Sequence, residues 1–441
     1  MILLQFIVLL FFIFLGARVG GIGVGFAGGA GVLALGFLGA TPGSLPMLVI
    51  VFITVVIVAV SAMQVAGGMD YLVDLTDRFL RRHPRYITLL APCVTYMLTL
   101  MASTGQVSFA TMPVIVEVCK ENNIRPTRAL SVGVAGSLLG ITASPISAAV
   151  VFLSGMLEEG KTGWGYLELI AVSIPSTFLG VMTTALFFML WDKARGHDIL
   201  ENVPEYRKRQ SEGKITPRRR AAPRPLDPGA KRSVFIFLIG LVVVLGYAIL
   251  ISPKLGIIDT PAMDGGQARI ATMLTVALVI IILCKADIHA LPQASVFRTG
   301  MTACVCILGV AWLGTTFMEN NQEWIGSIAA ESLRNTPWML AVVLVIASAL
   351  LYSQAATAKA LLPTALAIGI APAAVVACFP AVSGLFILPT YPTLLAAVDM
   401  DDTGSTQLGT KVFDHPFLVP GLMATALSVA FGFMLVAVMA I

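Results

Sequence analysis

The sequence has few charged residues and none of the common catalytic or nucleotide-binding patterns. Asp, Glu, Lys and Arg make up 12% of the 441 residues, against about 25% in an ordinary soluble domain. There is no phosphate-binding Walker sequence, no HExxH zinc sequence and no GxSxG in a strand–turn–helix context. These absences argue against an enzyme and against a protein that hydrolyses ATP.

Cysteine is also scarce, and its spacing excludes a metal centre or a disulfide framework. All six cysteines lie within or at the ends of apolar stretches, and none has the short spacing of a zinc site. We expect them to be packing residues and expect no cofactor. They are Cys93, Cys119, Cys284, Cys304, Cys306 and Cys378.

Apolar residues dominate instead. They make up 57% of the chain, and the mean hydropathy is +0.91. A single soluble core cannot bury so much apolar surface, so the lipid bilayer must be the solvent for most of the chain. We predict an all-α polytopic membrane protein. The first apolar stretch lacks a basic leader and a clear cleavage site, so we count it as a helix and not as a removed signal peptide.

One hydrophilic segment holds most of the positive charge. Residues 192–232 contain 12 of the 28 Lys and Arg residues but only 6 of the 24 Asp and Glu residues. In a membrane protein such a segment marks the cytoplasmic side. The alternative of a nucleic-acid patch is disfavoured, because charge runs in loops are usually just solvated.

Ten apolar stretches come close to the length of about 20 residues that a helix needs to cross a membrane. Two further regions, 87–121 and 337–368, are interrupted near the middle by small and polar residues. Each half of such a region is too short to cross, which is typical of a helical hairpin that enters and returns. The ten predicted spans are 1–16, 20–38, 47–66, 127–157, 167–191, 233–251, 266–284, 296–317, 373–398 and 415–440.

The distribution of Lys and Arg predicts two halves of opposite orientation. With residues 192–232 in the cytoplasm, 23 Lys and Arg residues lie inside and 4 outside, while Lys359 lies in the second hairpin, as the positive-inside rule requires. Residues 1–191 and 233–441 then form two inverted repeats, each with five spans and one hairpin. Both termini are expected to be periplasmic.

Polar breaks occur at matching places in the two predicted repeats. Ser103 and Pro113 of the first hairpin are ten residues apart, as are Ser353 and Pro363 of the second. The spans 127–157 and 373–398 are also interrupted. Paired breaks of this kind indicate a transporter site near the membrane midplane, and half-helix N-termini favour anions such as carboxylates. The candidate substrate-binding residues are Ser103, Thr104, Gly105, Thr142, Ser144, Pro145, Ser147, Ser353, Gln354, Thr390 and Tyr391.

Two alternatives remain open for these residues. Small hydroxyl residues and glycines also serve close helix packing, although four such clusters in symmetric positions favour a site. Lys359 follows the second break by about one turn. It could neutralise a substrate carboxylate, or its side chain could extend to the outer water.

Several stretches, in order along nearly the whole chain, resemble the A/B branch of the anaerobic C4-dicarboxylate uptake (Dcu) transporters. The resemblance implies a bacterial inner-membrane protein that exchanges or takes up fumarate, succinate, malate and aspartate, typically in anaerobic respiration. It also suggests an elevator-like movement of the hairpins. The matching stretches are 16–21, 80–86, 122–126, 143–147, 295–301, 353–356, 365–369, 388–392 and 419–421.

The chain departs from that family pattern at two positions. Leu394 stands where an acidic residue is expected, and Ala349 stands where a Lys is expected. Substrate preference therefore stays open within the dicarboxylates or towards another small organic anion. A membrane co-sensor that reaches a sensor kinase through residues 192–232 is a further alternative. Sodium and proton stay equally open as coupling ions, and GxxxG spacing such as Gly21 to Gly25 allows a homo-oligomer.

Overall fold

The computed structural model contains helices and no strand over the residues that it describes. One isolated antiparallel bridge joins Ile124 and Ile199. The prediction of an all-α protein is confirmed. The described residues are 2–19, 22–45, 47–103, 105–160, 163–215, 227–251, 257–258, 260–321, 336–367, 369–389, 391–409 and 413–439.

Up to Arg195, the described residues form nine α-helices and one 3₁₀ turn. Two of the helices, α5 and α6, occupy the region 87–121 and pack against each other. The elements are α1 (Ile2–Val19), α2 (Gly23–Phe37), α3 (Met47–Val65), α4 (Gly68–Arg82), η1 (Pro84–Tyr86), α5 (Ile87–Ala102), α6 (Gln106–Glu121), α7 (Pro126–Ala143), α8 (Ala148–Glu159) and α9 (Tyr166–Arg195).

The second part begins with two short elements in the basic segment and continues with longer helices. Here α15 and α16 occupy the region 337–368. The elements are η2 (Leu200–Asn202), α10 (Pro204–Ser211), α11 (Ala230–Leu250), α12 (Gly265–Cys284), η3 (Ile288–Gln293), α13 (Ser295–Asn320), α15 (Met339–Leu351), α16 (Gln354–Ala367), α17 (Pro372–Cys378), η4 (Phe379–Phe386), α18 (Pro392–Met400) and α19 (Leu418–Met439).

Six helices in the described part of the chain are long and apolar enough to cross a membrane. A seventh would arise if Thr54–Val65 of α3 and the whole of α4, which are bent by 70° relative to each other, were counted as one span. One of the six, Pro84–Ala102, is the first arm of the region that we interpreted as a hairpin, because η1 lengthens α5. The six are Pro84–Ala102, Pro126–Glu158, Tyr166–Arg195, Ala230–Leu250, Gly265–Cys284 and Leu418–Met439.

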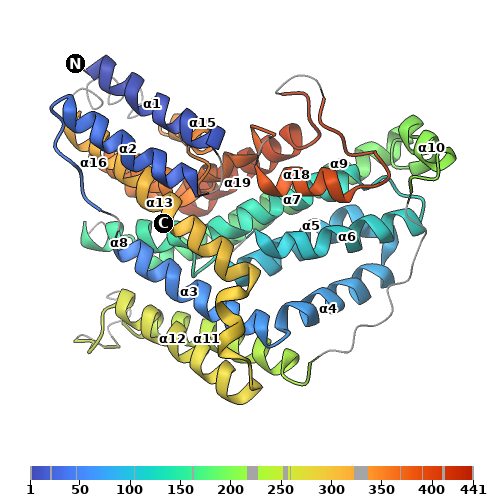
Figure 1. The fold of residues 1–441 in the computed structure, drawn as a ribbon, viewed down its shortest axis with the longest axis horizontal. Helices are drawn as coiled ribbons and strands as arrows, with labels where there is room; N and C mark the ends of the chain where they lie inside the picture. Colours follow the sequence, from blue (N-terminus) through green and yellow to red (C-terminus); the bar gives the residue numbers. More distant parts are fainter. Residues whose placement is uncertain are drawn as a thin grey trace.

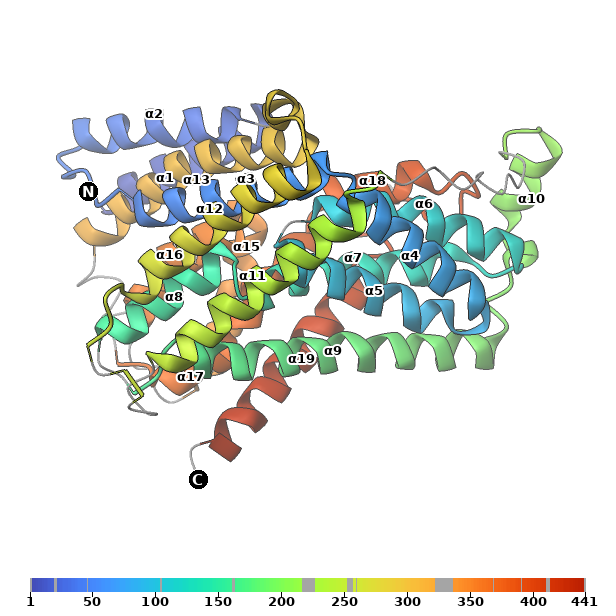
Figure 2. The ribbon, with the colours of Figure 1, turned by 90° about the horizontal axis from the view of Figure 1, so that it is seen from below.

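The helices form two packed groups (Figures 1 and 2). In the first group α2 and α3 pack on α13, α3 packs on α12, and α12 packs on α11. In the second group α5, α7, α9 and α19 pack together, and α15 and α17 lie against η4 and α19. The groups meet where α13 packs on α16 and α3 on α8.

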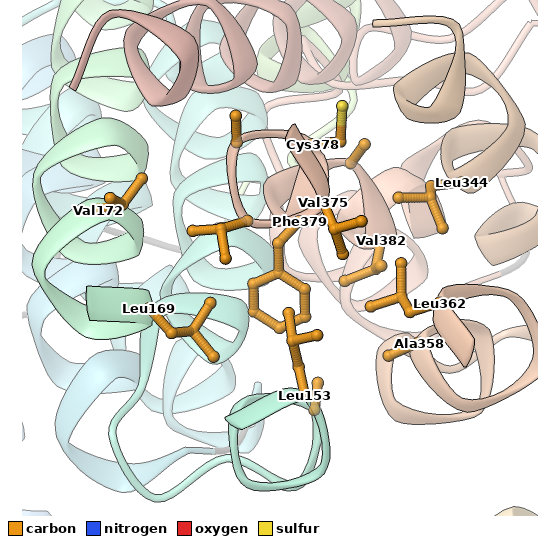
Figure 3. Close-up of a cluster of buried hydrophobic side chains, with 14 of the residues drawn as sticks. Leu153, Leu169, Val172, Leu344, Ala358, Leu362, Val375, Cys378, Phe379 and Val382 are labelled. Atoms are coloured by element: carbon orange, nitrogen blue, oxygen red, sulfur yellow. The ribbon is translucent and has the colours of Figure 1, made fainter. Parts of the chain in front are cut away.

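The largest buried cluster joins distant parts of the chain within the second group (Figure 3). Leu153 of α8 and Leu169 of α9 pack with Phe379 of η4 and Leu362 of α16, each less than 1% exposed. In a bilayer such side chains stabilise the arrangement by close van der Waals packing and not by leaving water. The core therefore fixes the second hairpin and η4 against the first half of the chain.

The region 373–398 differs from the single interrupted helix that we predicted. It contains α17, the 3₁₀ segment η4 and, after a break at 387–391, α18. Pro380 lies at the start of η4, and Gly384 has non-helical angles inside it. A proline lacks the N–H needed for α-helical bonding, so the chain tightens into a 3₁₀ segment before the predicted break.

Candidate functional site

The pairs α5/α6 and α15/α16, which form the two predicted hairpins, each turn at a non-glycine residue in the left-handed conformation. Ser103 ends α5 with φ of 52°, and Tyr352 ends α15 with φ of 53°. The Ser103 N–H donates to the Thr99 carbonyl at 2.7 Å, and the Tyr352 N–H donates to the Ser348 carbonyl at 3.0 Å. A left-handed residue closes a helix C-terminus by bonding its last carbonyls. The two tips therefore use the same local geometry.

The break between α7 and α8 is built from three of the predicted residues. The Ser147 hydroxyl accepts from the Val150 N–H at 3.2 Å and so caps α8. The Pro145 carbonyl accepts from the Tyr166 hydroxyl at 2.8 Å. The Ser144 hydroxyl is fully buried and has no partner among the described residues. Such an oxygen is costly to bury and is available to a ligand.

A buried polar cluster joins the second hairpin to both interrupted helices. The Gln354 amide donates to the Leu138 carbonyl at 2.7 Å and to the Ser383 hydroxyl at 3.3 Å. The Ser383 and Thr142 hydroxyls share a short hydrogen bond. Gln354 is 5% exposed, while Thr142 and Ser383 are fully buried. Satisfied polar groups in a low-dielectric interior hold a specific arrangement. We refer to Gln354, Leu138, Thr142 and Ser383 as the central cluster.

The tip of the first hairpin lies against α18. A Cβ atom placed on Gly105 would lie 3.4 Å from Thr393 Cγ2 and 3.8 Å from Ser137 Oγ. The Thr393 hydroxyl is buried and has no partner in the described part of the chain. The Tyr391 ring, at the start of α18, lies 6.3 Å from the Tyr352 ring, measured between centroids. Each hairpin tip thus approaches the start of α18.

The remaining predicted residues have separate environments. The Ser353 hydroxyl accepts from the Ala356 N–H at 3.2 Å and caps α16. Lys359 is 4% exposed and lies 5.4 Å from the Phe152 ring centroid on α8, so its side chain does not extend to water. Thr104 and Thr390 lie outside the described residues.

Sequence reasoning missed Ser383 and Thr393. Ser383 lies in an apolar stretch five residues before the predicted break, and Thr393 lies just after it. A Ser-Gly pair three residues after Pro380 was a usable signal, because proline and glycine together interrupt a helix. At the two positions that depart from the family pattern, Leu394 is fully buried and Ala349 is 6% exposed.

The arrangement can bind anionic oxygens without a formal cation at the tips. The helices α6, α8, α16 and α18 all begin at a tip or a break, and a helix N-terminus carries a partial positive charge of about half a unit. The Ser144 and Thr393 hydroxyls add donors that have no protein partner among the described residues. Oxyanions such as carboxylate, phosphate and sulfate are the ligands that such groups bind.

Comparisons with known proteins match the chain to one family. Residues 1–440 match the family described as "Anaerobic c4-dicarboxylate membrane transporter". The chain is 52% identical over 436 residues to the C4-dicarboxylate transporter DcuA of Escherichia coli (strain K12), covering 99% of both chains. It is 51% identical to DcuA of Wolinella succinogenes, covering 98% of both. It is 36% identical to the anaerobic C4-dicarboxylate transporter DcuB of Escherichia coli O6:H1, again covering 98% of both.

One solved structure shares the fold. The YdaH transporter of Alcanivorax borkumensis matches with a TM-score of 0.53 at 14% identity, covering 88% of this chain and 84% of that one. At this identity the likeness concerns the fold alone.

Proposed function

Because this chain belongs to the DcuA/DcuB family of anaerobic C4-dicarboxylate membrane transporters, we propose that it moves fumarate, succinate, malate and aspartate across the bacterial inner membrane. The movement is exchange of one dicarboxylate for another or ion-coupled uptake. The relatives are transporters and not enzymes by name, and the chain is a membrane transporter of the same family.

The observation that carries the proposal is the central cluster. Gln354 of the second hairpin, Thr142 of α7 and Ser383 of η4 converge on one carbonyl. The tip of the first hairpin lies nearby: Gly105 approaches Thr393 of α18 and also Ser137 of α7, the residue before Leu138. Two hairpin tips with two interrupted helices supply two sets of donors, which suits a substrate with a carboxylate at each end.

Packing supports an elevator-like movement of the second group against the first. The two hairpins share one group with the interrupted helices. The cluster around Phe379 ties the second hairpin to α8 and η4, and another buried cluster ties the first hairpin to α7, η4 and α18. In the proposed cycle this group moves as a unit past α1–α3 and α11–α13, carrying the bound substrate. The basic segment 192–232 is cytoplasmic and both termini are periplasmic in this proposal.

Counterflow in liposomes tests the function. Purified protein is reconstituted in vesicles preloaded with succinate, and labelled fumarate is added outside. We expect rapid uptake that requires the internal succinate. Absence of uptake by folded protein would reject the dicarboxylate proposal, and a competition panel of monocarboxylates and amino acids would then identify another anion.

A second candidate is a co-sensor that contacts a sensor kinase through the basic segment. The observation in its favour is that the described part of this segment is anchored on the transport helices. The Arg125 N–H donates to the Asp198 carbonyl at 2.7 Å, and Arg209 donates to the Asp402 carbonyl at 3.3 Å. Deleting residues 216–226 should leave flux intact in either case. A loss of signalling in the deletion strain supports the sensor role, and unchanged signalling rejects it.

A further inference from the structure

Lys359 has a buried amine that forms no ion pair with the described residues. It is 4% exposed, and none of the ion pairs in the described part of the chain involves it. Its ammonium nitrogen lies 5.4 Å from the centre of the Phe152 ring. Lys120, which is equally buried at 5% exposed, pairs with Asp402 at 2.8 Å. Of the two buried lysines in the described part of the chain, Lys359 is therefore the unpaired one.

The described side chains on the elements around Lys359 supply no compensating charge. Helix α16 packs against α8, α13, α15, α17 and η4, and α15, α17 and η4 contain no charged residue. On α8, the Glu158 carboxylate accepts from the Tyr166 N–H at 3.1 Å, and the Glu159 side chain lies outside the description. On α13, Glu319 accepts from the Ser44 hydroxyl at 2.8 Å, and Arg298 is exposed near the start of the helix. The titratable cysteines on these elements, Cys304, Cys306 and Cys378, are neutral when protonated.

An isolated ammonium in such surroundings has two ways to lower its free energy. It can lose its proton to water, or an anion can arrive close to it, because burial penalises the charged form and a nearby opposite charge favours it. Lys359 lies five residues after Gln354 on the same helix, about 7.5 Å along its axis. Five residues also turn about 140° around the helix, so a dianion at the hairpin tips would act on Lys359 through the low-dielectric interior and not by contact.

We propose that Lys359 carries the proton that couples net dicarboxylate uptake. The neutral amine takes a proton from water when the dianion binds, keeps it during the crossing, and returns it to water on the other side when the dianion leaves. The empty carrier goes back with a neutral amine. In exchange the carrier is loaded in both directions, so the proton movements cancel. This inference rests on the proposed function and names its coupling ion.

Net uptake and counterflow together test the inference. Full-length protein in vesicles with the membrane potential held at zero is given labelled fumarate, with the outside one pH unit more acidic or at equal pH. One proton per substrate should raise accumulation about tenfold per pH unit, since one unit of proton gradient is worth a tenfold equilibrium ratio. Counterflow by the same vesicles should not depend on the pH gradient.

Lys359→Arg is the informative variant, because arginine keeps its charge but does not release its proton. We expect the tenfold stimulation of accumulation by the pH gradient to disappear. Under that gradient, the ratio of net uptake to counterflow should therefore be about tenfold lower than in the wild-type protein. Lys359→Gln should also lose the stimulation, having no proton to carry. Lys120→Arg, at the buried lysine that is paired, is the matched control and should keep it.

The outcomes separate this inference from the function on which it rests. If wild-type protein shows no counterflow, the proposed function fails. If it shows counterflow but its accumulation ignores the pH gradient, the inference is overturned. The same holds if Lys359→Arg or Lys359→Gln, shown to be folded by its counterflow, still accumulates tenfold more substrate per pH unit.

Discussion

At the scale of single residues, the central cluster depends on one amide. Gln354 donates to the Leu138 carbonyl at 2.7 Å and is 5% exposed. Replacing it with Leu leaves the buried Leu138 carbonyl and the Ser383 hydroxyl with fewer partners, which costs about 1–3 kcal/mol. We predict that Gln354→Leu lowers the fumarate counterflow rate about ten- to a hundredfold, with unchanged membrane insertion.

The control for this residue is a buried hydroxyl outside the cluster. Thr425 of α19 is 2% exposed, and its hydroxyl has no partner among the described residues. Thr425→Val should therefore transport at the wild-type rate. Equal transport by Gln354→Leu and Thr425→Val would remove Gln354 from the site.

Tyr166 offers a second residue-scale prediction, because it connects the break to α12. Its hydroxyl donates to the Pro145 carbonyl at 2.8 Å, and Arg269 stacks 4.7 Å from its ring. Tyr166→Phe removes one hydrogen bond of about 1 kcal/mol and should lower transport about fivefold. Tyr96→Phe removes a comparable buried bond to the Ile174 carbonyl, away from the break, and should lower thermal stability without affecting transport. An unaffected Tyr166→Phe protein would show that the break does not need this support.

At the scale of elements, the approach of the first hairpin tip to α18 makes a steric prediction. A Cβ on Gly105 would meet Thr393 Cγ2 at an ordinary contact distance of 3.4 Å, and Gly105 has φ of −67°. Alanine adds only this Cβ and fits. Valine adds two further methyl groups beside a Cβ that already contacts Thr393. We expect Gly105→Ala to keep transport within about twofold and Gly105→Val to lose most of it. Wild-type counterflow by Gly105→Val would separate this tip from the substrate path.

The sequence was a good guide to the elements, because apolar length and proline position are local properties. Helices α7, α17 and α18 begin at Pro126, Pro372 and Pro392, because proline is favoured in the first turn of a helix. The 3₁₀ character of η4 was not predictable in the same way. Pro380 is a local signal for an interruption, but the course of η4 also depends on a tertiary contact. Gly384 lies so close to α15 that a Cβ there would be 2.6 Å from the Val345 carbonyl.

The candidate site shows the same division between local and tertiary information. Ser103 and Ser144 stood out because each lies beside a visible break. Ser383 did not, since its role comes from the Leu138 and Gln354 groups that fold beside it from 29 or more residues away. The assignment of all these residues to substrate binding, and the division into inverted repeats, remain predictions.

At the scale of the whole molecule, the proposed movement can be blocked by a cross-link between the two groups. A Cβ on Gly314 of α13 would lie 3.4 Å from the Ala360 Cβ of α16, near the Cβ separation of about 3.5–4.5 Å found in disulfides. In a background without other cysteines, oxidised Gly314→Cys/Ala360→Cys protein should lose at least about 90% of its counterflow, and a reductant should restore it. The lost movement of α16 past α13 is the physical reason.

The matched cross-link lies within the group that is proposed to stay still. A Cβ on Gly240 of α11 would lie 3.5 Å from the Val276 Cβ of α12. A disulfide between Gly240→Cys and Val276→Cys joins α11 to its neighbour within this group, so oxidation should leave counterflow unchanged. Suppose instead that mass spectrometry shows the Gly314–Ala360 pair to be fully cross-linked. If the oxidised protein still exchanges fumarate as fast as the chemically reduced protein does, α16 does not move past α13. The substrate must then cross by local opening of the hairpin tips within a static bundle.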